Sequence, residues 1–301
     1  MNSEAAIAGV RVASRGGRLA AYYELTKPRV LTMVLITTLA GYYMGSGGAD
    51  LDLALALKIL LGTGLAAGGT LALNQFFERA TDARMERTCN RPLPLGRLRP
   101  VEALVFGLIA SAAGVAGLWL TINPLTAAIT ATITVLYLGA YTPLKRYTWM
   151  CQVIGAVPGA LPPVIGWAAA RNDITAEPLV MFGIMFLWQL PHSLSIARLY
   201  QADYLRAGIH PLPQDRAWGN PANVLMLAAT MALVAFGTLP TLMGFAGRLY
   251  LAVAIVFGMV MLYHGIRLVR GATTSAAARR VLMVSLVYLP VVLLAMVLDK
   301  A

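Results

Sequence analysis

Uninterrupted apolar segments of about twenty residues recur along the chain, and they constrain its fold more than any other feature. The bilayer core holds no water to bind backbone amides, so a segment that crosses it must close its own hydrogen bonds as a helix. The continuous apolar runs exclude a barrel and predict an all-α polytopic bundle of about nine transmembrane helices. These are expected at about 29–46, 52–77, 101–121, 123–141, 151–170, 178–200, 220–243, 247–269 and 278–298.

The composition and the placement of charge agree with a membrane protein. The chain is 58% hydrophobic and 12% charged, with a mean hydropathy of +0.70, whereas soluble domains carry about 25% charged residues. Basic residues are retained on the cytoplasmic side, and all but four of the 24 Lys and Arg residues fall on the side of the N-terminus. The four others are Lys58, Arg171, Arg248 and Lys300. This bias, with attraction to anionic lipid, explains the net charge of +11 without nucleic-acid binding.

We expect a cytoplasmic N-terminal segment at 1–28, without the apolar core of a secretory signal, and a single transmembrane domain at 29–298. The loops after the second, fourth, sixth and eighth helices then share one membrane side, where "YTPLKRYT" and "RLYQADYLRAG" can meet the charged stretch after the second helix. Two pairs of glycines in small-xxx-small spacing predict close helix packing: Gly64 and Gly68, and Gly155 and Gly159.

The charged stretch "NQFFERATDARMERTCNRPLPLGR" is the clearest candidate site. Asn74, Glu78 and Asp82 recur every four residues, so they lie on nearly one face of a helix, about 6 Å apart along its axis. Like charges at this spacing repel, and acids at a helix C-terminus oppose the macrodipole. A bound cation would relieve both penalties, and Mg²⁺ prefers one or two carboxylates completed by waters and substrate phosphates.

Arginines follow the carboxylates directly. Arg87 and Arg91 offer fork-shaped donors that suit phosphate oxygens, so the combination predicts a metal-bridged diphosphate. The alternative is an interfacial loop whose charges pair with one another and with lipid headgroups. Lys145 and Arg146 are open to the same two interpretations.

A second candidate lies in "LWQLPHSLSIARLYQADYLRAG". His192 and Asp203 are eleven residues apart and share a face if the helix continues past the membrane surface. A histidine in a span is either packed against a neighbouring helix or functional. Cys89 and Cys151 show no metal-ligand or disulfide spacing and are given no role.

The first signature, "NQFFERATDARMERTCNRPL", resembles that of the UbiA-type intramembrane prenyltransferases, and Met85, Arg87-Thr88 and Arg91-Pro92-Leu93 resemble its haem O synthase branch. The resemblance continues, in order, through "ELTKPRV", "YTPLKRYT", "GALPPVIGW", "FLWQLPHSL" and "DYLRAGIHPLP". It implies a bundle of nine helices with a lateral opening to the bilayer. It also implies that two acidic motifs hold Mg²⁺ and the diphosphate of an allylic donor.

The resemblance also implies a role for particular residues. It makes Glu78, Asp82 and Asp203 metal ligands, and it places Asn74 and His192 with them in the catalytic set. The diphosphate would bind Arg87, Arg91, Lys145 and Arg146, and the acceptor would contact Trp188 and His192. The sequence departs from the family at Cys151, Ser193, Gln201-Ala202 and His210-Pro211, which leaves one acid in the second motif, with Asp215 a distant substitute.

The implied reaction transfers the farnesyl group of farnesyl diphosphate to a vinyl group of haem b, giving haem O. Haem A synthase and terminal oxidase assembly are the partners that such a reaction implies, besides membrane lipids, and the bacterial inner membrane is its expected location. Another acceptor, a quinone precursor or a chlorin, is an alternative within the same class. A polytopic transporter is an alternative from another class, although transporters place their polar residues near the bilayer midplane.

Overall fold

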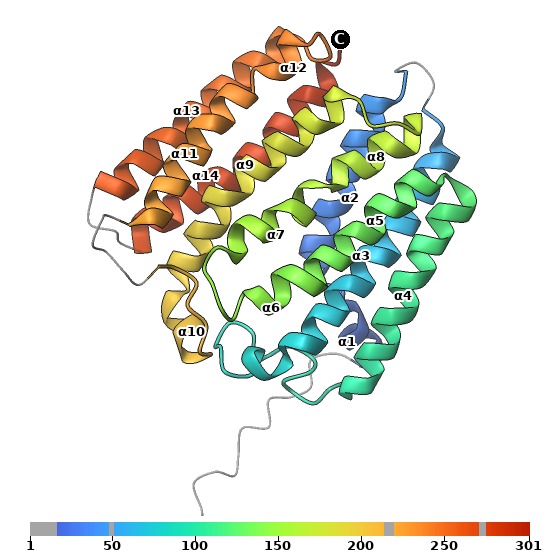
Figure 1. Ribbon diagram of the computed structural model, residues 1–301, viewed down its shortest axis with the longest axis vertical. Coiled ribbons are helices and arrows are strands. Elements are labelled where there is room, and N and C mark those ends of the chain that lie inside the picture. The colour runs from blue at the N-terminus through green and yellow to red at the C-terminus, as the bar shows by residue number, and fades with distance from the viewer. Residues whose placement is uncertain (1–16, 48–50, 214–219, 271–274) are drawn as a thin grey trace, which may run out of the picture.

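Long helices joined by short turns make up most of the chain (Figure 1). The computed structural model describes residues 17–47, 51–213, 220–270 and 275–301. Within these ranges no strand occurs, and the one isolated bridge pairs Ala246 with Lys300. The helices are α1 (Arg18–Leu25), α2 (Pro28–Gly45), α3 (Leu53–Asp82), α4 (Pro100–Thr121), α5 (Pro124–Val135), the π-helix η1 (Leu136–Tyr141), α6 (Thr142–Leu144), α7 (Cys151–Ala160), α8 (Pro162–Arg171), α9 (Ala176–Leu199), α10 (Gln201–Arg206), α11 (Pro221–Phe236), α12 (Leu239–Leu242), α13 (Arg248–Arg270) and α14 (Ser275–Leu298).

The described helices confirm the predicted all-α membrane bundle. Eight helical stretches are long and apolar enough to cross a bilayer, and the 18-residue helix α2 packs along α8 beside them. Together they correspond to the nine predicted spans. Asp215 and residues 1–16 lie outside the described residues.

Several predicted helices differ from the observed ones where proline interrupts them. The span expected at 151–170 is two helices, because Pro162 and Pro163 lack the amide protons that would continue the ladder past Leu161. The span expected at 220–243 likewise divides into α11 and α12 before Pro240. The helix α1 was not predicted, since its eight residues have little apolar character.

The most extensive packing between two helices joins α3 to α4. A methyl group added at Gly69 would lie 2.5 Å from the backbone nitrogen of Ser111, so only glycine fits there. The predicted role of Gly64 and Gly68 is wrong, because a methyl group at either would meet its nearest neighbour at an ordinary 3.4 Å or more. The second predicted pair does pack closely: methyl groups at Gly155 and Gly159 would lie 2.5 Å and 2.3 Å from the side chains of Tyr141 and Gln189.

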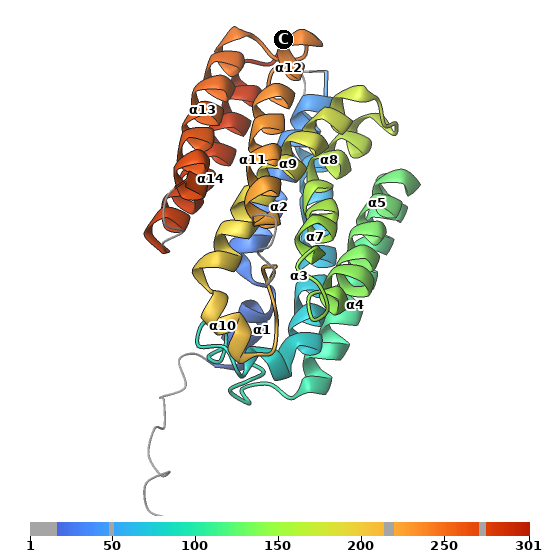
Figure 2. The same ribbon diagram turned by 60° about the vertical axis from the view of Figure 1, so that its left-hand side comes forward.

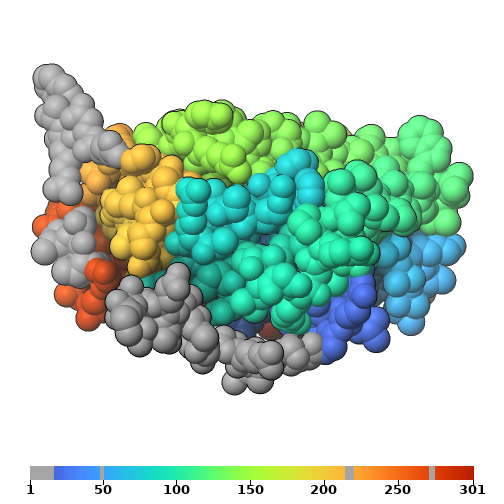
Figure 3. Space-filling model, turned by 90° about the horizontal axis from the view of Figure 1, so that it is seen from below, coloured from blue at the N-terminus to red at the C-terminus, as the bar shows by residue number. Residues whose placement is uncertain are grey.

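One end of the bundle gathers the polar loops, as the sequence predicted. The helices α1, α6 and α10 and the loop at 83–99, which joins α3 to α4, all lie at the lower end in Figures 1 and 2. Figure 3 looks at this end directly and shows the loop lying across its centre, beside α10.

At the opposite end of the bundle, Lys300 and Arg171 form hydrogen bonds with the C-terminal end of α2. The ammonium of Lys300 donates to the carbonyl of Tyr43 at 2.7 Å and to that of Ser46, and Arg171 donates to the carbonyl of Gly45 at 2.9 Å. These carbonyls lie at the end of α2, where the backbone lacks helical amides to bind them all, so the two cations stabilise its C-terminus.

Candidate active site

The last three turns of α3 carry Asn74, Glu78 and Asp82 on the face predicted from their spacing. All three are buried, with exposed fractions of 1%, 6% and 1%. Carboxylates so far from water are costly unless cations or hydrogen bonds compensate them. The chain must therefore bring compensating groups from elsewhere.

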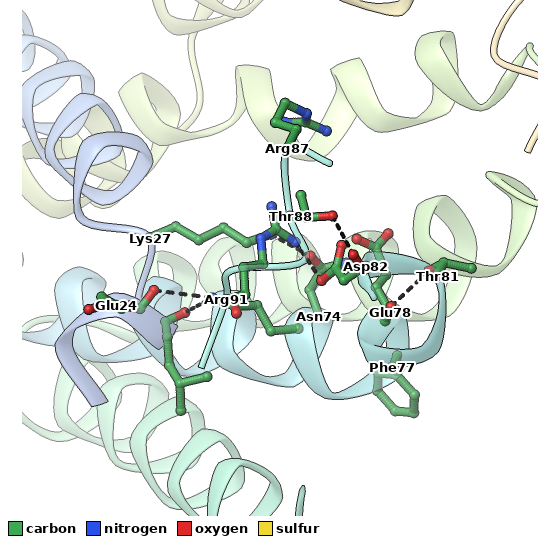
Figure 4. Close-up of polar contacts among 12 residues, drawn as sticks. Glu24, Lys27, Asn74, Phe77, Glu78, Thr81, Asp82, Arg87, Thr88 and Arg91 are labelled. Carbon is green, nitrogen blue, oxygen red and sulfur yellow. Dashed lines mark hydrogen bonds and ion pairs between the residues drawn. The ribbon is translucent and has the colours of Figure 1, made fainter. Parts of the chain in front are cut away.

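Three basic residues from three separate segments surround this face, and Figure 4 shows two of them, Lys27 and Arg91. Lys145, directly after α6, lies 3.0 Å from Glu78 Oε1. Arg91, in the loop at 83–99, lies 2.6 Å from Asp82 Oδ2. Lys27 donates to Asn74 Oδ1 at 2.6 Å. The stretch at 74–97 and "YTPLKRYT" thus meet, as expected from their shared side of the membrane.

Burial and neighbouring charge move the pKa of two of these lysines in opposite directions. Burial disfavours the ammonium of Lys145, but the charge of Glu78 and its hydrogen bond, together with Tyr204 and Tyr137, raise the pKa of Lys145 above its usual value. Burial, aided by the positive charge of Arg91, lowers the pKa of Lys27 to about 7. Lys27 therefore titrates near neutrality.

Lys27 was not predicted as a site residue, because in the sequence it is one of many basic residues on the same side of the membrane. It precedes Pro28, which disfavours the helical conformation, and it adopts a left-handed backbone with φ of 47°. A non-glycine residue in this region is strained, and such residues concentrate at functional sites. The dipeptide Lys-Pro before an apolar span was the available signal.

The two other predicted diphosphate ligands, Arg87 and Arg146, do not contact the carboxylates of α3, and only Arg87 lines the cavity. Arg87 lines the cavity described below, with its guanidinium over the ring of Tyr200 at 5.2 Å. Arg146 is exposed and donates to the carbonyl of Phe77 at 3.3 Å, outside that lining.

The carboxylates fit a divalent cation in one specific respect. Asp82 Oδ1 is buried and has no hydrogen-bond partner among the described residues, as expected for an oxygen that binds a metal ion. Across all the residues that the structure describes, no three His, Cys, Asp or Glu side chains are close enough to share an ion. Glu78 and Asp82 could therefore hold Mg²⁺ only with oxygens from water or substrate, which is the coordination Mg²⁺ commonly adopts.

Asp203 lies on the other side of the loop at 83–99. Its carboxylate accepts from the backbone amides of Glu86 at 2.8 Å and Arg87 at 3.1 Å. The helix α9 ends at Leu199 and α10 begins at Gln201, so the helix does not run on unbroken from His192 to Asp203, which was the condition for the two residues to share a face.

A cavity of about 230 Å³ opens between these groups. It is lined by Lys27, Asn74, Glu78, Asp82, Arg87, Arg91 and Lys145 together with Val30, Leu71, Tyr137, Tyr141, Gln152, Ser193, Ile196 and Tyr204. A second, apolar cavity of about 110 Å³ shares Val30, Leu71 and Tyr137 with it and continues among α2, α3, α5, α7 and α8. A charged chamber therefore leads into an apolar one, which suits a ligand with an anionic head and a hydrocarbon chain.

The predicted acceptor residues form a group around Ser285 of α14. Trp188 and His192 stack with ring centroids 4.8 Å apart, and the Trp188 indole donates to the Ser285 carbonyl at 2.8 Å. The Ser285 hydroxyl donates its single proton to the carbonyl of Leu282 at 2.7 Å, so it must accept from His192 Nδ1, 2.8 Å away. In the neutral ring this tautomer carries its lone pair on Nε2, where it is available for a metal or a proton.

Comparison with known proteins identifies the class to which this fold and site belong. The model of the UbiA prenyltransferase family matches residues 34–287, which is most of the chain. The chain belongs to the UbiA prenyltransferase family. It is an integral-membrane prenyltransferase, and the transporter alternative is set aside.

Curated relatives within the UbiA family resemble the chain over nearly its full length. A protein of Solibacter usitatus named protoheme IX farnesyltransferase is 46% identical over 288 residues, which cover 93% of this chain and 98% of the relative. A protein of the same name from Koribacter versatilis is 40% identical, with 93% of each chain covered.

Solved structures of UbiA-type proteins share the fold. One, described as digeranylgeranylglyceryl phosphate synthase, superposes with a TM-score of 0.79 at 18% identity and covers 94% of this chain and 98% of that one. A UbiA homologue from Archaeoglobus fulgidus bound to GPP and Mg²⁺ gives a TM-score of 0.64 at 15% identity, with 92% and 99% covered. At these identities the likeness supports the fold alone.

Proposed function

We propose that this chain transfers the farnesyl group of farnesyl diphosphate to a vinyl group of protohaem, producing haem O. The relatives named protoheme IX farnesyltransferase, which cover nearly the whole chain, carry this proposal. The site agrees with this proposal, because buried carboxylates and four basic residues line a cavity that adjoins an apolar one. No observation favours a quinone precursor or a chlorin as the acceptor.

The chain's own groups would bind the donor by exchanging partners. Arg87, Arg91 and Lys145 would contact the oxygens of the diphosphate, and Lys27 would add a further contact, because all four line the same cavity. The carboxylates of Glu78 and Asp82 would then face Mg²⁺, which supplies Lewis-acid neutralisation of the departing diphosphate when bound. In the described structure the same carboxylates are neutralised by Arg91 and Lys145.

In the reaction, the bond between C1 of the farnesyl group and the diphosphate oxygen breaks, and its electron pair leaves with the diphosphate. The terminal carbon of the acceptor's vinyl group bonds to C1, and water then adds as hydroxide to the neighbouring carbon and releases a proton. The rings of Tyr137 and Tyr141, 5.1 Å apart, line the cavity and would keep water from the allylic cation while their faces stabilise it.

His192 would serve the acceptor. Its Nε2 lone pair could bind the haem iron or take the released proton, because Ser285 fixes the other ring nitrogen as a donor. Trp188, stacked on His192, offers a flat partner for a porphyrin face.

We further propose that the protein lies in a bacterial inner membrane with the site facing the cytoplasm. The concentration of basic residues at this end supports that orientation. Haem A synthase and the terminal oxidase assembly stay predictions as partners.

The test is expression of the chain in a strain that lacks its own enzyme for this step, followed by mass spectrometry of the extracted haems. A new haem whose mass exceeds that of haem b by one farnesyl group and one hydroxyl group is the expected result. The variant D82N is the matched control and should yield haem b alone. A prenylated quinone precursor or chlorin in place of haem O would contradict the assignment of the acceptor.

A further inference from the structure

The C-terminal part of the chain carries arginines but no acidic residues. Residues 221–298 contain five arginines and neither Asp nor Glu. Four of these arginines gather at the neighbouring ends of two packed helices, where α13 ends and α14 begins. They are Arg267 and Arg270 on α13, and Arg279 and Arg280 on α14, and all four are exposed. We call these four residues the arginine cluster.

No carboxylate in the described part of the chain neutralises the arginine cluster. Arginines of other segments on the same side of the membrane form salt bridges, as Arg97 does with Glu24. Among the described residues, no member of the cluster belongs to such a pair. Arg267 contacts Tyr263 instead, with its guanidinium 5.7 Å from the ring centroid. Neighbouring positive charges repel one another, so an anion that neutralises the cluster must come from outside these helices.

A groove of about 540 Å³ lies between the ends of the two helices that carry the cluster. It is lined by His264 of α13 and by Ser275, Ala276, Arg279, Arg280, Met283 and Val284 of α14. Arg267 and Arg280 both interact electrostatically with His264, so positive charge from both helices converges on the groove. The helices α13 and α14 form an outer edge of the bundle, where lipid can reach the groove (Figures 1 and 2).

The groove changes from basic to apolar within about one helical turn. Arg279 and Arg280 stand at one end of its lining, and Met283 and Val284 follow them along α14 toward the middle of the span. The next outward-facing side chain on this helix, Leu286, is also exposed and apolar. A ligand with an anionic head and a hydrocarbon chain matches this gradient, whereas a soluble anion would use only the basic end.

The position of the cluster within its helices separates a binding site from a simple orientation signal. Basic residues that only set the orientation of the protein need no common groove. Arg267 and Arg270 also complement the negative end of the helix dipole at the C-terminus of α13. Arg279 and Arg280 have no such explanation, because they lie in the first two turns of α14, and helix N-termini favour acids.

We propose that the groove between α13 and α14 binds the phosphate of an anionic phospholipid, with Arg279 and Arg280 as its principal ligands and an acyl chain along Met283. The planar guanidinium presents paired donors that suit phosphate oxygens. Basic pockets between transmembrane helices commonly take such headgroups. The site is separate from the candidate active site, because no residue lines both this groove and the charged cavity.

The first test measures lipid binding by the purified protein in detergent free of lipid. Native mass spectrometry follows titration with dioleoylphosphatidylglycerol and, separately, with dioleoylphosphatidylcholine, which has the same acyl chains and no net charge. The wild type should bind one phosphatidylglycerol roughly tenfold more tightly than phosphatidylcholine. R279Q/R280Q should weaken phosphatidylglycerol binding by roughly tenfold or more and leave phosphatidylcholine binding unchanged, whereas R279K/R280K should keep most of the preference.

The matched control is R29Q/R84Q. It removes two exposed arginines from the same side of the membrane, and neither belongs to a salt bridge among the described residues. Its affinity for phosphatidylglycerol should stay within about twofold of the wild type. Thermal midpoints in lipid-free detergent should be alike for the wild type and both glutamine variants, because the exchanged side chains form no described salt bridge.

The second test locates the lipid on the wild type and needs no variant. Phosphatidylglycerol with a photoactivatable diazirine in its acyl chain is crosslinked to the protein, and the modified peptides are sequenced. The crosslinks should concentrate at Met283 and Val284, and unlabelled phosphatidylglycerol should suppress them at concentrations at which phosphatidylcholine does not.

Three results would overturn the proposal. Equal affinity of the wild type for the two lipids would remove the role of the anionic phosphate. An equal loss in R29Q/R84Q and R279Q/R280Q, or crosslinks spread evenly over the spans, would mean diffuse attraction by net charge. A dimer without lipid that R279Q/R280Q dissociates would mean that a second copy of the chain covers the groove. None of these measurements depends on the proposed reaction or its acceptor.

Discussion

Replacing Lys27 with arginine should abolish the uptake of a proton that accompanies donor binding near pH 8. The free protein holds Lys27 with a pKa of about 7, because it is buried beside Arg91. A bound diphosphate is a nearby anion and favours the charged lysine, so binding raises this pKa back toward its ordinary value. Protons are therefore taken up at any pH between about 7 and the pKa in the complex.

The expected size follows from the titration of a single group. At pH 8 a lysine with a pKa of about 7 is about 10% protonated, so binding takes up about 0.9 proton, whereas at pH 6 it takes up about 0.1. The affinity for the donor should correspondingly fall by up to about tenfold per pH unit above 7. Arginine stays charged throughout this range and removes the linkage.

Isothermal titration calorimetry in two buffers of different ionisation enthalpy counts these protons. A non-reactive farnesyl diphosphate analogue is used with saturating Mg²⁺ for the wild type and for K27R, so that protons contributed by the ligand and the metal cancel in the difference. Equal proton uptake by both proteins at pH 8 would refute the linkage, and would mean that Lys27 is either charged in the free protein or remote from the diphosphate.

Three further predictions concern other parts of the molecule. D82N should lower turnover by orders of magnitude in a haem O assay while the protein stays folded in the membrane, and full activity of the wild type in excess chelator would argue against the metal-assisted mechanism. In intact cells an impermeant maleimide should not label Cys89, while Cys151 is buried and adds no background; labelling would reverse the proposed orientation. K300A should lower the thermal midpoint in detergent by an amount equivalent to about 1 kcal/mol, because the carbonyls of Tyr43 and Ser46 at the end of α2 lose the ammonium of Lys300 as a donor; an unchanged midpoint would show that this contact is unimportant.

Much of the fold could be predicted from the sequence, because a bilayer leaves an apolar segment little choice but a helix. The positions at which proline interrupts a helix could not be predicted. Prolines are tolerated within α9 and α14, at Pro191 and Pro290, whereas Pro162 and Pro163 end a helix. Which outcome follows depends on how neighbouring helices satisfy the freed carbonyls, and that is a property of the packed bundle.

The candidate site was predictable to the extent that it is local. The spacing of Asn74, Glu78 and Asp82 fixes their common face, and the structure shows that face buried. Contacts between segments far apart in the sequence could not be predicted. Examples are the hydrogen bond from Lys27 to Asn74 and the contact of Asp203 with the loop at 83–99. Basic residues on one side of a membrane look alike in sequence, so the half-buried Lys145 and the exposed Arg146 could not be told apart.

The π-helix η1 determines the direction in which the side chains directly after it point, including that of Lys145. A π-helical turn bonds each amide to a carbonyl five residues back, and the amide and hydroxyl of Thr142 both donate to the carbonyl of Tyr137. One extra residue in an otherwise α-helical segment rotates the subsequent side chains by about 100°. The salt bridge between Lys145 and Glu78 therefore depends partly on the number of residues in "LYLGAY". Inserting or deleting one residue there would turn Lys145 away from Glu78, although both charged residues would still be present.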